Sequence, residues 1–254
     1  MGSEQRHSTQ PTEDTKYNNA GFVGGFILRQ YPDTVQIGGG SVLLGRGVTA
    51  RYYKYLGSAV SNFIVKGCTA LDVGCGAGRM TAELAIQGAR LAVGIDTSLA
   101  MVHISRTIVC SRGDKFVFEF PGSKQTLRRA SIDTLGVSNC AFALMDAQAL
   151  AFPTNSVGFI VCANVLHRVS EPRLVLAELQ RILSPGGYLL LSNNFDWQTS
   201  FTENSRWLTQ HEIIHYFRDW QVLARRDRLP YLAYLYDHKY ILSVNQVILF
   251  RKPR

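Results

Sequence analysis

Short apolar runs alternate with amphipathic helical patterns along most of the chain after Gly67. Apolar runs of five or six residues predict strands at Cys68–Val73, Arg90–Ile95, Ala141–Met145, Phe159–Ala163 and Tyr188–Ser192. Apolar residues at helical spacing predict helices between them, at Arg79–Gln87, Ser98–Cys110 and Glu171–Leu183. Strands and helices in alternation predict an α/β fold, with a mostly parallel sheet that helices cover on both faces.

The start of the chain has a different pattern. Residues 1–20 hold few large apolar side chains and are expected to form a disordered tail. Between Arg51 and Lys66, apolar and aromatic residues recur at three- and four-residue steps, which predicts an amphipathic helix that ends at Gly67. There is no signal-peptide pattern and no run of the roughly 18 to 20 apolar residues that crosses a bilayer. We therefore expect a cytoplasmic protein with one folded domain over residues 21–254.

Other stretches interrupt the alternation of strand and helix. Gly113–Asn139 contains an alternating run, a Pro-Gly-Ser turn and several basic residues, which predicts an insertion that carries a hairpin. Asn193–Leu208 is polar and aromatic without a period and follows a strand, where α/β sheets commonly bind ligands. Gln221–Phe250 is expected to form two strands, separated at Leu229-Pro230-Tyr231.

Composition and charge narrow the class of protein. Apolar residues make up 46% of the chain and charged residues 18%, which is typical of a globular protein. The net charge of +8 raises nucleic acid, an anionic ligand or a membrane surface as partners. Because the basic residues are scattered and no RNA-binding module is appended, a solvated basic face is expected, with no nucleic acid or membrane partner. Five widely spaced cysteines predict neither a disulfide framework nor a zinc ribbon.

The strongest chemical signal is a glycine-rich turn between a predicted strand and a predicted helix. Gly74, Gly76 and Gly78 alternate there, and glycines allow a tight turn in which backbone N–H groups approach a ligand. The next strand ends at Asp96, about 20 positions further, where a carboxylate can accept both hydroxyls of a ribose. The G-x-G-x-G spacing differs from the G-x-G-x-x-G of dinucleotide-binding folds.

With Asp72 before it, this turn resembles the first motif of class I S-adenosylmethionine-dependent methyltransferases. Met145-Asp146-Ala147 resembles the acidic loop of that family, and Ser184-Pro185-Gly186-Gly187 its helix-to-strand corner, although Val157-Gly158 stands where the family usually carries an aspartate. The resemblance implies S-adenosylmethionine as cofactor and a Rossmann-like methyltransferase fold with a seven-stranded sheet. The positions to which it assigns the cofactor are Asp72, Gly74, Gly76, Gly78, Asp96, Thr97, Asp146, Ala147 and Asn164.

A second resemblance concerns the methyl acceptor. Asn164-Val165-Leu166-His167 lacks the [D/N]-P-P-[Y/F] motif typical of enzymes that methylate nucleobase amines, which argues against such a substrate. Ser192–Leu208 resembles the segment after the fifth strand of the 4-mercaptohistidine N1-methyltransferase domain in ovothiol-pathway sulfoxide synthases. The insertion at Gly113–Asn139 resembles that family too, as do Arg226–Leu232 and Ser243-Val244. The resemblance implies N-methylation of a small thiol-histidine, an amino-acid-like substrate supplied by a separate sulfoxide synthase.

Methyl transfer to a neutral imidazole nitrogen requires mainly in-line positioning and exclusion of water. We expect His167, Asp196 and Trp197 at the catalytic centre, and Asn164, Arg168 and Thr202 in the substrate site. Arg168 would face the substrate carboxylate, and Asp196 its ammonium group or an imidazole N–H. The alternatives are that Trp197 only packs against its neighbours and that His167 is a solvent-exposed loop residue.

Other functions stay open on the sequence. His211-Glu212-Ile213-Ile214-His215 matches the H-E-x-x-H zinc motif, but Arg218 stands where the metzincin glycine belongs, and no glutamate follows Glu212 as a third ligand. Asp219, Asp227 and Asp237 remain as alternative third ligands. The expectation is an amphipathic helix without metal, with Ile214 and Phe217 facing inward and Ile213 as a further inward candidate. The remaining alternatives are methylation of another small molecule, a non-catalytic methyltransferase-fold protein that activates a partner, and an RNA-binding protein.

Overall fold

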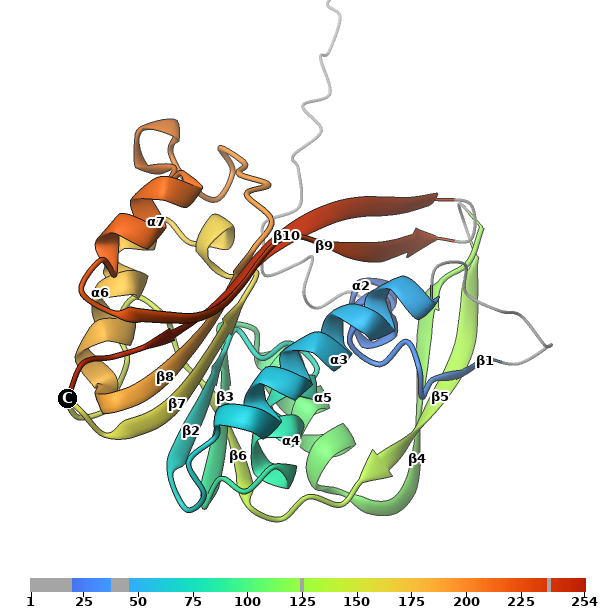
Figure 1. Ribbon diagram of the computed structural model, residues 1–254. Helices are drawn as coiled ribbons and strands as arrows, with labels where there is room; N and C mark the ends of the chain where they lie inside the picture. The colour runs from blue at the N-terminus through green and yellow to red at the C-terminus, as the bar shows by residue number, and fades with distance from the viewer. Residues whose placement is uncertain (1–19, 38–45, 124–125, 237–238) are drawn as a thin grey trace, which may run out of the picture.

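The computed structural model describes residues 20–37, 46–123, 126–236 and 239–254, and a seven-stranded sheet forms its centre (Figure 1). The strand order is β6-β3-β2-β7-β8-β10-β9. Strands β2, β3, β6, β7 and β8 run parallel, whereas β10 is antiparallel to both of its neighbours. The strand bounds are β2 (Thr69–Val73), β3 (Leu91–Asp96), β6 (Cys140–Leu144), β7 (Val157–Ala163), β8 (Leu183–Asn193), β9 (Gln221–Tyr236) and β10 (Lys239–Arg251). The predicted α/β fold with a mostly parallel sheet is confirmed.

Helices cover both faces of this sheet because successive strand residues point to opposite sides. Phe159 and Val161 pack with α3 (Arg46–Phe63) and α4 (Arg79–Ile86), and α5 (Leu99–Cys110) lies on the same side. Ile160 and Cys162 pack on the other side with α6 (Pro172–Ile182) and α7 (Gln210–Tyr216). Two short 3₁₀ helices, η2 (Leu166–Arg168) and η3 (Asn204–Arg206), lie in the loops after β7 and β8. No helix in the described ranges is long and apolar enough to cross a lipid bilayer.

The insertion forms the predicted hairpin, and the hairpin belongs to a second, three-stranded sheet. Strands β4 (Arg112–Pro121) and β5 (Leu127–Leu135) pair antiparallel, and β1 (Gln36–Ile37) adds to β5. Phe118 and Phe120 of the hairpin share a core with Ile27 of α2 (Ala20–Gln30). Helix α2 was not among the predicted elements. The tail expected over residues 1–20 lies outside the described residues, except for Ala20, where α2 begins.

The expected break at Leu229-Pro230-Tyr231 is wrong. β9 continues through these residues, and Pro230 pairs with Val244 of β10. Proline is tolerated because β9 is the edge strand of the sheet, where a missing N–H facing away from β10 breaks no ladder bond. Side chains of the preceding helices occupy neighbouring backbone groups on that outer edge: Thr49 Oγ1 donates to Leu232 O at 2.7 Å and accepts from Leu232 N at 3.2 Å, and Arg29 donates to Tyr234 O at 3.1 Å.

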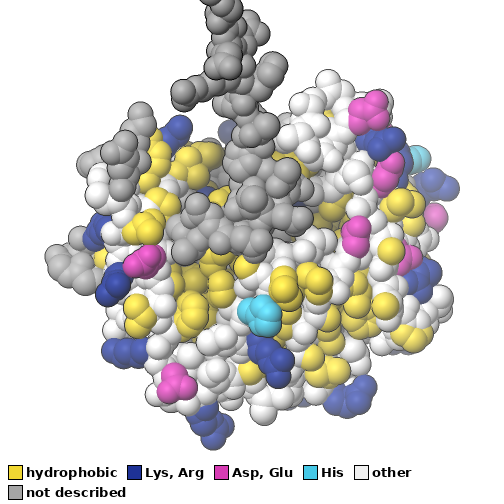
Figure 2. All heavy atoms as spheres, turned by 180° about the vertical axis from the view of Figure 1, so that it is seen from behind, with side chains coloured by type: hydrophobic (Ala, Val, Ile, Leu, Met, Phe, Trp, Pro, Cys, Tyr) yellow, Lys and Arg dark blue, Asp and Glu magenta, His cyan; other side chains and the backbone are white. Residues whose placement is uncertain are grey.

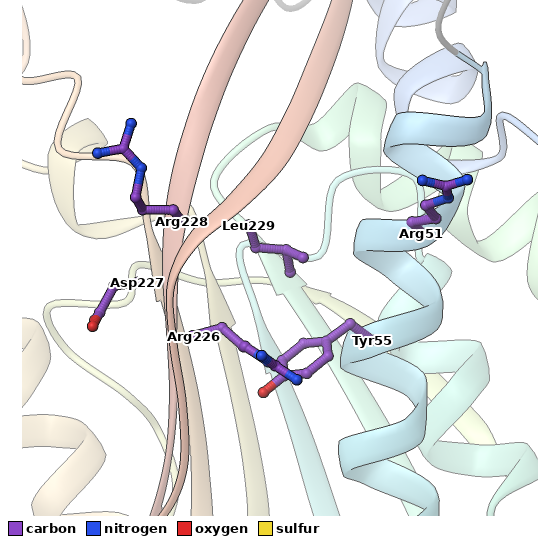
Figure 3. Close-up of a pocket in the computed structure, with 6 residues that line it drawn as sticks. All are labelled: Arg51, Tyr55, Arg226, Asp227, Arg228 and Leu229. Carbon is purple, nitrogen blue, oxygen red and sulfur yellow. The ribbon is translucent and has the colours of Figure 1, made fainter.

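A β-bulge interrupts the pairing of β9 with β10. Arg226 pairs with Val247 and Leu229 with Asn245, so two residues of β9, Asp227 and Arg228, oppose the single Gln246 of β10. Bulges re-aim side chains. Arg226 and Leu229 both point toward α3, and Asp227 projects away from it (Figure 3).

Candidate active site

The glycine-rich turn joins β2 to α4 at the carboxyl edge of the parallel strands. Gly74 and Gly76 have positive φ angles of +66° and +54°, which favour glycine. A Cβ at Gly74 would lie 2.5 Å from Val165 Cγ2, and one at Gly76 would lie 2.5 Å from Gln30 Nε2. The turn therefore fits closely between the loop after β7 and helix α2, and only glycine fits there.

Asp96 ties the end of β3 to this turn. Its Oδ2 accepts a hydrogen bond from Gly76 N at 3.0 Å, and its Oδ1 accepts one from Ser98 N at 2.9 Å. Burial raises the pKa of the Asp96 carboxyl above its ordinary value, while these backbone donors oppose the shift. Each carboxylate oxygen has further acceptor capacity, so Asp96 can take the hydroxyls of a ribose. Thr97, the next residue, is exposed.

Asp72 and Gly78 support the turn from inside the protein. The Asp72 side chain is 3% exposed, and its Oδ2 accepts a 2.8 Å hydrogen bond from Thr81 Oγ1. Burial raises the pKa of Asp72 to about 7. Gly78 is the N-cap of α4 and packs against Ser105 and Val109 of α5. Both residues are predicted to bind the cofactor; in the structure Asp72 is buried beside α4 and Gly78 forms the N-cap of that helix.

The acidic residue after β6 lies beside this part of the site. Leu144, the last residue of β6, pairs with Asp96, and Met145 N donates to Asp96 O at 3.0 Å. Asp146 follows with an exposed carboxylate, whose Oδ1 accepts from Gln148 N at 2.9 Å. Ala147 is buried. The glycine turn, Asp96 and Asp146 thus lie at one edge of the sheet, which is compatible with the predicted roles of Asp96 toward the cofactor ribose and of Asp146 toward its adenine amino group.

Helix α2 and the residue that follows it make contacts with the glycine turn that were not predicted from the sequence. Gln30 Nε2 donates to Cys75 O at 3.0 Å, and Gln30 Oε1 accepts from Arg79 N at 3.2 Å. Tyr31 donates its hydroxyl to Ala77 O at 3.1 Å. These bonds connect the backbone of the glycine turn to the end of α2 and to the residue that follows it. The signal was the apolar spacing of Val23, Ile27 and Leu28, which is typical of a buried helix face.

Beyond the glycine turn, the loop after β7 holds a buried histidine. His167 lies in η2 and is 2% exposed, and its Nδ1 is 2.8 Å from Asn193 Oδ1 at the end of β8. Because Phe195 N also donates to that oxygen, at 3.4 Å, we assign the oxygen as acceptor and place the His167 proton on Nδ1. Burial, followed by the charge of Arg168, lowers the pKa of His167 to about 4. His167 is therefore a neutral imidazole with a lone pair on Nε2.

Aromatic residues of the loop after β8 flank His167. The Trp197 ring meets the His167 ring edge-on at 6.5 Å and stacks on Trp207 at 6.4 Å. Trp207 Nε1 donates to Thr202 O at 2.9 Å. Thr202 was expected in the substrate site, but its side chain is fully enclosed, and its hydroxyl donates to Val169 O at 2.6 Å. In this arrangement Thr202 joins the loops after β7 and β8.

Arg168 and Asp196 lie together at the surface of these loops. Arg168 Nη2 is 3.7 Å from Asp196 Oδ2, and the Arg168 guanidinium lies 4.6 Å from the centre of the Phe201 ring. Both side chains are more than a third exposed, so the ion pair is solvated and weak. Either group can exchange its partner for a charged group of a ligand.

Four polar side chains meet on the face of the sheet that α3 covers, and we call them the amide cluster: Tyr52, Asn164, Ser192 and Asn245. Tyr52 of α3 donates its hydroxyl to Ser192 Oγ at 2.9 Å, and Asn164 donates Nδ2 to the Tyr52 hydroxyl at 3.3 Å. Asn245 Nδ2 donates to Asn164 Oδ1 at 3.0 Å and to Ser192 Oγ at 3.3 Å. Asn164 has a positive φ of +61°. Only Asn164 of these four was predicted as a site residue.

A separate hollow of about 510 Å³ lies between α3 and β9 (Figure 3). Its lining residues are Arg51, Tyr55, Arg226, Asp227, Arg228 and Leu229. The Arg226 guanidinium lies 5.9 Å from the centre of the Tyr55 ring, and Asp227 Oδ1 is bound by Arg225 Nε at 2.6 Å. No predicted site residue lines this hollow.

The H-E-x-x-H segment forms α7, whose inward residues Ile213 and Phe217 are each 1% exposed. Glu212 takes part in a capping box with Thr209 and pairs with Arg173 at 3.0 Å. His211 and His215 are exposed, and their rings stack at 6.2 Å. Within the described ranges, no group of three or more His, Cys, Asp or Glu side chains is placed to hold a metal ion. The motif is accounted for by helix capping and core packing.

Comparison with known proteins places the fold in a family. Residues 49–226 match the family model for a methyltransferase domain. The chain belongs to this methyltransferase family. It is a class I S-adenosylmethionine-dependent methyltransferase, as the first resemblance predicted, and S-adenosylmethionine is its cofactor.

Curated relatives of this methyltransferase include quinone-pathway enzymes. The ubiquinone/menaquinone biosynthesis C-methyltransferase UbiE of Teredinibacter turnerae is 30% identical over 139 residues, which are 55% of this chain and 48% of the relative. The demethylmenaquinone methyltransferase of Renibacterium salmoninarum is 29% identical over 150 residues, 59% of this chain and 50% of the relative. The chain thus spans about half the length of these relatives.

Solved structures share the fold at low sequence identity. The N-methyltransferase NodS of Bradyrhizobium japonicum, in complex with S-adenosyl-L-homocysteine, superposes with a TM-score of 0.53 at 18% identity, covering 82% of this chain and 88% of NodS. A SAM-dependent methyltransferase of Methanosarcina mazei superposes with a TM-score of 0.55 at 20% identity, covering 77% of this chain and 97% of that one. The resemblance to the thiol-histidine N-methyltransferase has no counterpart among these proteins.

Proposed function

We propose that this methyltransferase transfers a methyl group to an imidazole nitrogen of a small thiol-histidine. The proposal rests on one observation: the segment that resembles the thiol-histidine enzymes supplies Trp197 and Trp207, which stack beside the buried, neutral His167. A flat ring acceptor suits an aromatic wall, and the neutral imidazole beside it can accept a hydrogen bond from a polar hydrogen of the acceptor.

Each residue of the site has a task in such a reaction. The bound cofactor supplies a sulfonium methyl group that is already activated. Trp197 and Trp207 exclude water and orient the acceptor ring. Asn193 accepts the hydrogen of His167 Nδ1 and so orients the neutral His167 ring, whose Nε2 can accept a hydrogen bond from the acceptor. The methylated imidazolium then loses its ring proton to solvent.

The ion pair of Arg168 and Asp196 fits the amino-acid end of the acceptor. A zwitterionic α-amino acid carries a carboxylate for Arg168 and an ammonium group for Asp196. Both side chains are exposed, and their charged atoms are 3.7 Å apart, so breaking this ion pair costs little free energy. The charged groups of the acceptor can then pair with Arg168 and Asp196 instead. We infer further that a cytoplasmic sulfoxide synthase, which forms the carbon–sulfur bond, supplies this acceptor.

The test combines cofactor binding with product detection. Calorimetry should show binding of S-adenosylmethionine, and mass spectrometry should show that 5-thiohistidine gains one methyl group while plain histidine gains much less. Trp197→Ala should lower kcat/KM for 5-thiohistidine by about tenfold or more, because the ring wall is lost. Binding of the cofactor without methylation of 5-thiohistidine would reject the thiol-histidine assignment and leave the methyltransferase family membership intact.

The second candidate is C-methylation of a small ring compound, which the names of the curated relatives favour. The same assay with a demethylmenaquinone separates the two functions. Methylation of a quinone ring carbon, with none of 5-thiohistidine, would establish this candidate instead.

A further inference from the structure

The amide cluster contains a polar atom that the described residues leave unpaired. Asn245 is fully buried, and both hydrogens of its Nδ2 are used, by Asn164 and Ser192. Its Oδ1 has no hydrogen-bond partner within the described residues. Turning the amide over would leave Nδ2 without an acceptor instead, so either orientation leaves one unpaired atom. A buried amide oxygen without a donor loses its hydration with no compensation, and such atoms are rare in native proteins.

The position of Asn245 connects this atom with the active site. Gln246 pairs with Asn193, the last residue of β8, so Asn245 lies one residue beyond the end of that strand. Asn164 directly follows β7, and the next residue, Val165, lies against the glycine turn. The cluster therefore lies at the carboxyl edge of the sheet, between helix α3 and the loop that borders the cofactor site.

We propose that the amide cluster binds the methyl acceptor, with Asn245 Oδ1 accepting a hydrogen bond from a ring N–H of that acceptor. The inference rests on the proposed function in so far as the acceptor is a nitrogen heterocycle. An imidazole whose N–H is held by Asn245 presents the lone pair of its other nitrogen. The cluster thus selects the tautomer, and with it the nitrogen that is methylated. A ring that carries only hydrogen-bond acceptors and no N–H, such as a quinone, would leave Asn245 Oδ1 unpaired.

The remaining residues of the cluster position Asn245. Asn164 and Ser192 use both hydrogens of its amide nitrogen, which directs Oδ1 and prevents rotation of the amide. Tyr52 in turn holds both partners through its hydroxyl. A site that distinguishes between two ring nitrogens needs a hydrogen-bond acceptor held rigidly in one position, and Asn245 Oδ1 is held in this way.

The test uses imidazole and 1-methylimidazole as probes, both titrated at pH 8 into protein saturated with S-adenosylhomocysteine. Imidazole carries an N–H, and 1-methylimidazole does not. Wild type should bind imidazole about tenfold more tightly than 1-methylimidazole, and Asn245→Leu should bind the two alike. Tyr52→Phe should reduce the preference in part. Loss of the preference in Asn245→Leu, with S-adenosylhomocysteine affinity unchanged, supports the proposal.

Asn139→Ala is the matched control. Asn139 also donates twice from Nδ2, to Ala85 O at 3.0 Å and Ala89 O at 2.8 Å, but it lies at the amino end of β6. This variant should lower the melting temperature and keep the preference for imidazole. No binding of imidazole by wild type, or an equal preference in Asn245→Leu, would overturn the proposal, and the cluster would then be structural. Neither result depends on turnover of 5-thiohistidine, which tests the proposed function separately.

Discussion

Two buried titratable side chains at the site respond to pH in opposite directions. The pKa of Asp72 is raised to about 7 in the folded protein, so the folded protein loses stability as the pH rises from about 4 through 7 and the buried carboxyl has to ionise. The pKa of His167 is lowered to about 4, so the folded protein loses stability as the pH falls from about 6.5 toward 4. Between these limits the two effects on the free energy of unfolding oppose each other.

Single substitutions should separate the two effects. Asp72→Asn keeps an acceptor for Thr81 and removes the buried charge, so this variant should be more stable than wild type by a few kcal/mol above pH 7 and equal to it near pH 4. In the variant His167→Asn, the free energy of unfolding should no longer decrease between pH 6.5 and 4 on account of this residue. Chemical denaturation across this pH range measures both. Parallel pH profiles for wild type and Asp72→Asn would contradict the assigned shift.

Gly74 offers a second test at a single residue. Gly74→Ala should weaken S-adenosylhomocysteine binding by about tenfold or more, because the new Cβ would lie 2.5 Å from Val165 and displace the turn. Gly67→Ala is the matched control: φ at Gly67 is also positive, at +79°, but nothing lies within 4 Å of its Cβ position. Calorimetry should show unchanged binding for this control. If Gly74→Ala also binds unchanged, the close approach to Val165 does not control the shape of the turn that binds the cofactor.

At the scale of elements, the predictable parts are those with a strong local signal. The strand at β2, the glycine turn and α4 were all placed to within about a residue, since apolar runs and glycines define them locally. The apolar spacing of Val23, Ile27 and Leu28 is a local signal for α2 that was overlooked, but its role has no local signal, because Gln30 and Tyr31 reach the turn from more than 40 residues away in sequence. The β9 strand was divided wrongly, because Pro230 is a turn signal in sequence and is harmless at a sheet edge.

Helix α2 should contribute to cofactor binding through Gln30. Gln30→Ala removes the bonds to Cys75 O and Arg79 N and should weaken S-adenosylhomocysteine binding about five- to tenfold, with about 1 kcal/mol of lost stability. Gln36→Ala, which removes an exposed contact to Asp133, should bind as wild type does. Calorimetry and thermal unfolding measure the two effects. An unchanged affinity in Gln30→Ala would show that the turn holds its shape without α2.

At the scale of the whole molecule, the site depends on residues that the fold gathers from distant segments. The amide cluster draws on α3, β8, β10 and the loop after β7, and only Asn164 had a motif to mark it. Tyr52, Ser192 and Asn245 lie in ordinary amphipathic or apolar patterns, so their roles follow only from the sheet order. The net charge of +8 was a poor guide, because basic side chains stand singly among apolar and acidic ones on the face in Figure 2.

The edge strand β9 bears on how copies of this protein meet. An open edge normally presents a row of free N–H and C=O groups, which invites a strand of another molecule to extend the sheet. Here Thr49 occupies both outer groups of Leu232, Arg29 occupies the carbonyl of Tyr234, and Pro230 has no N–H to offer. The bulge at Asp227 and Arg228 bends the strand further along. Another copy therefore cannot extend the sheet continuously along this stretch of β9, because its outer backbone groups are already occupied or absent.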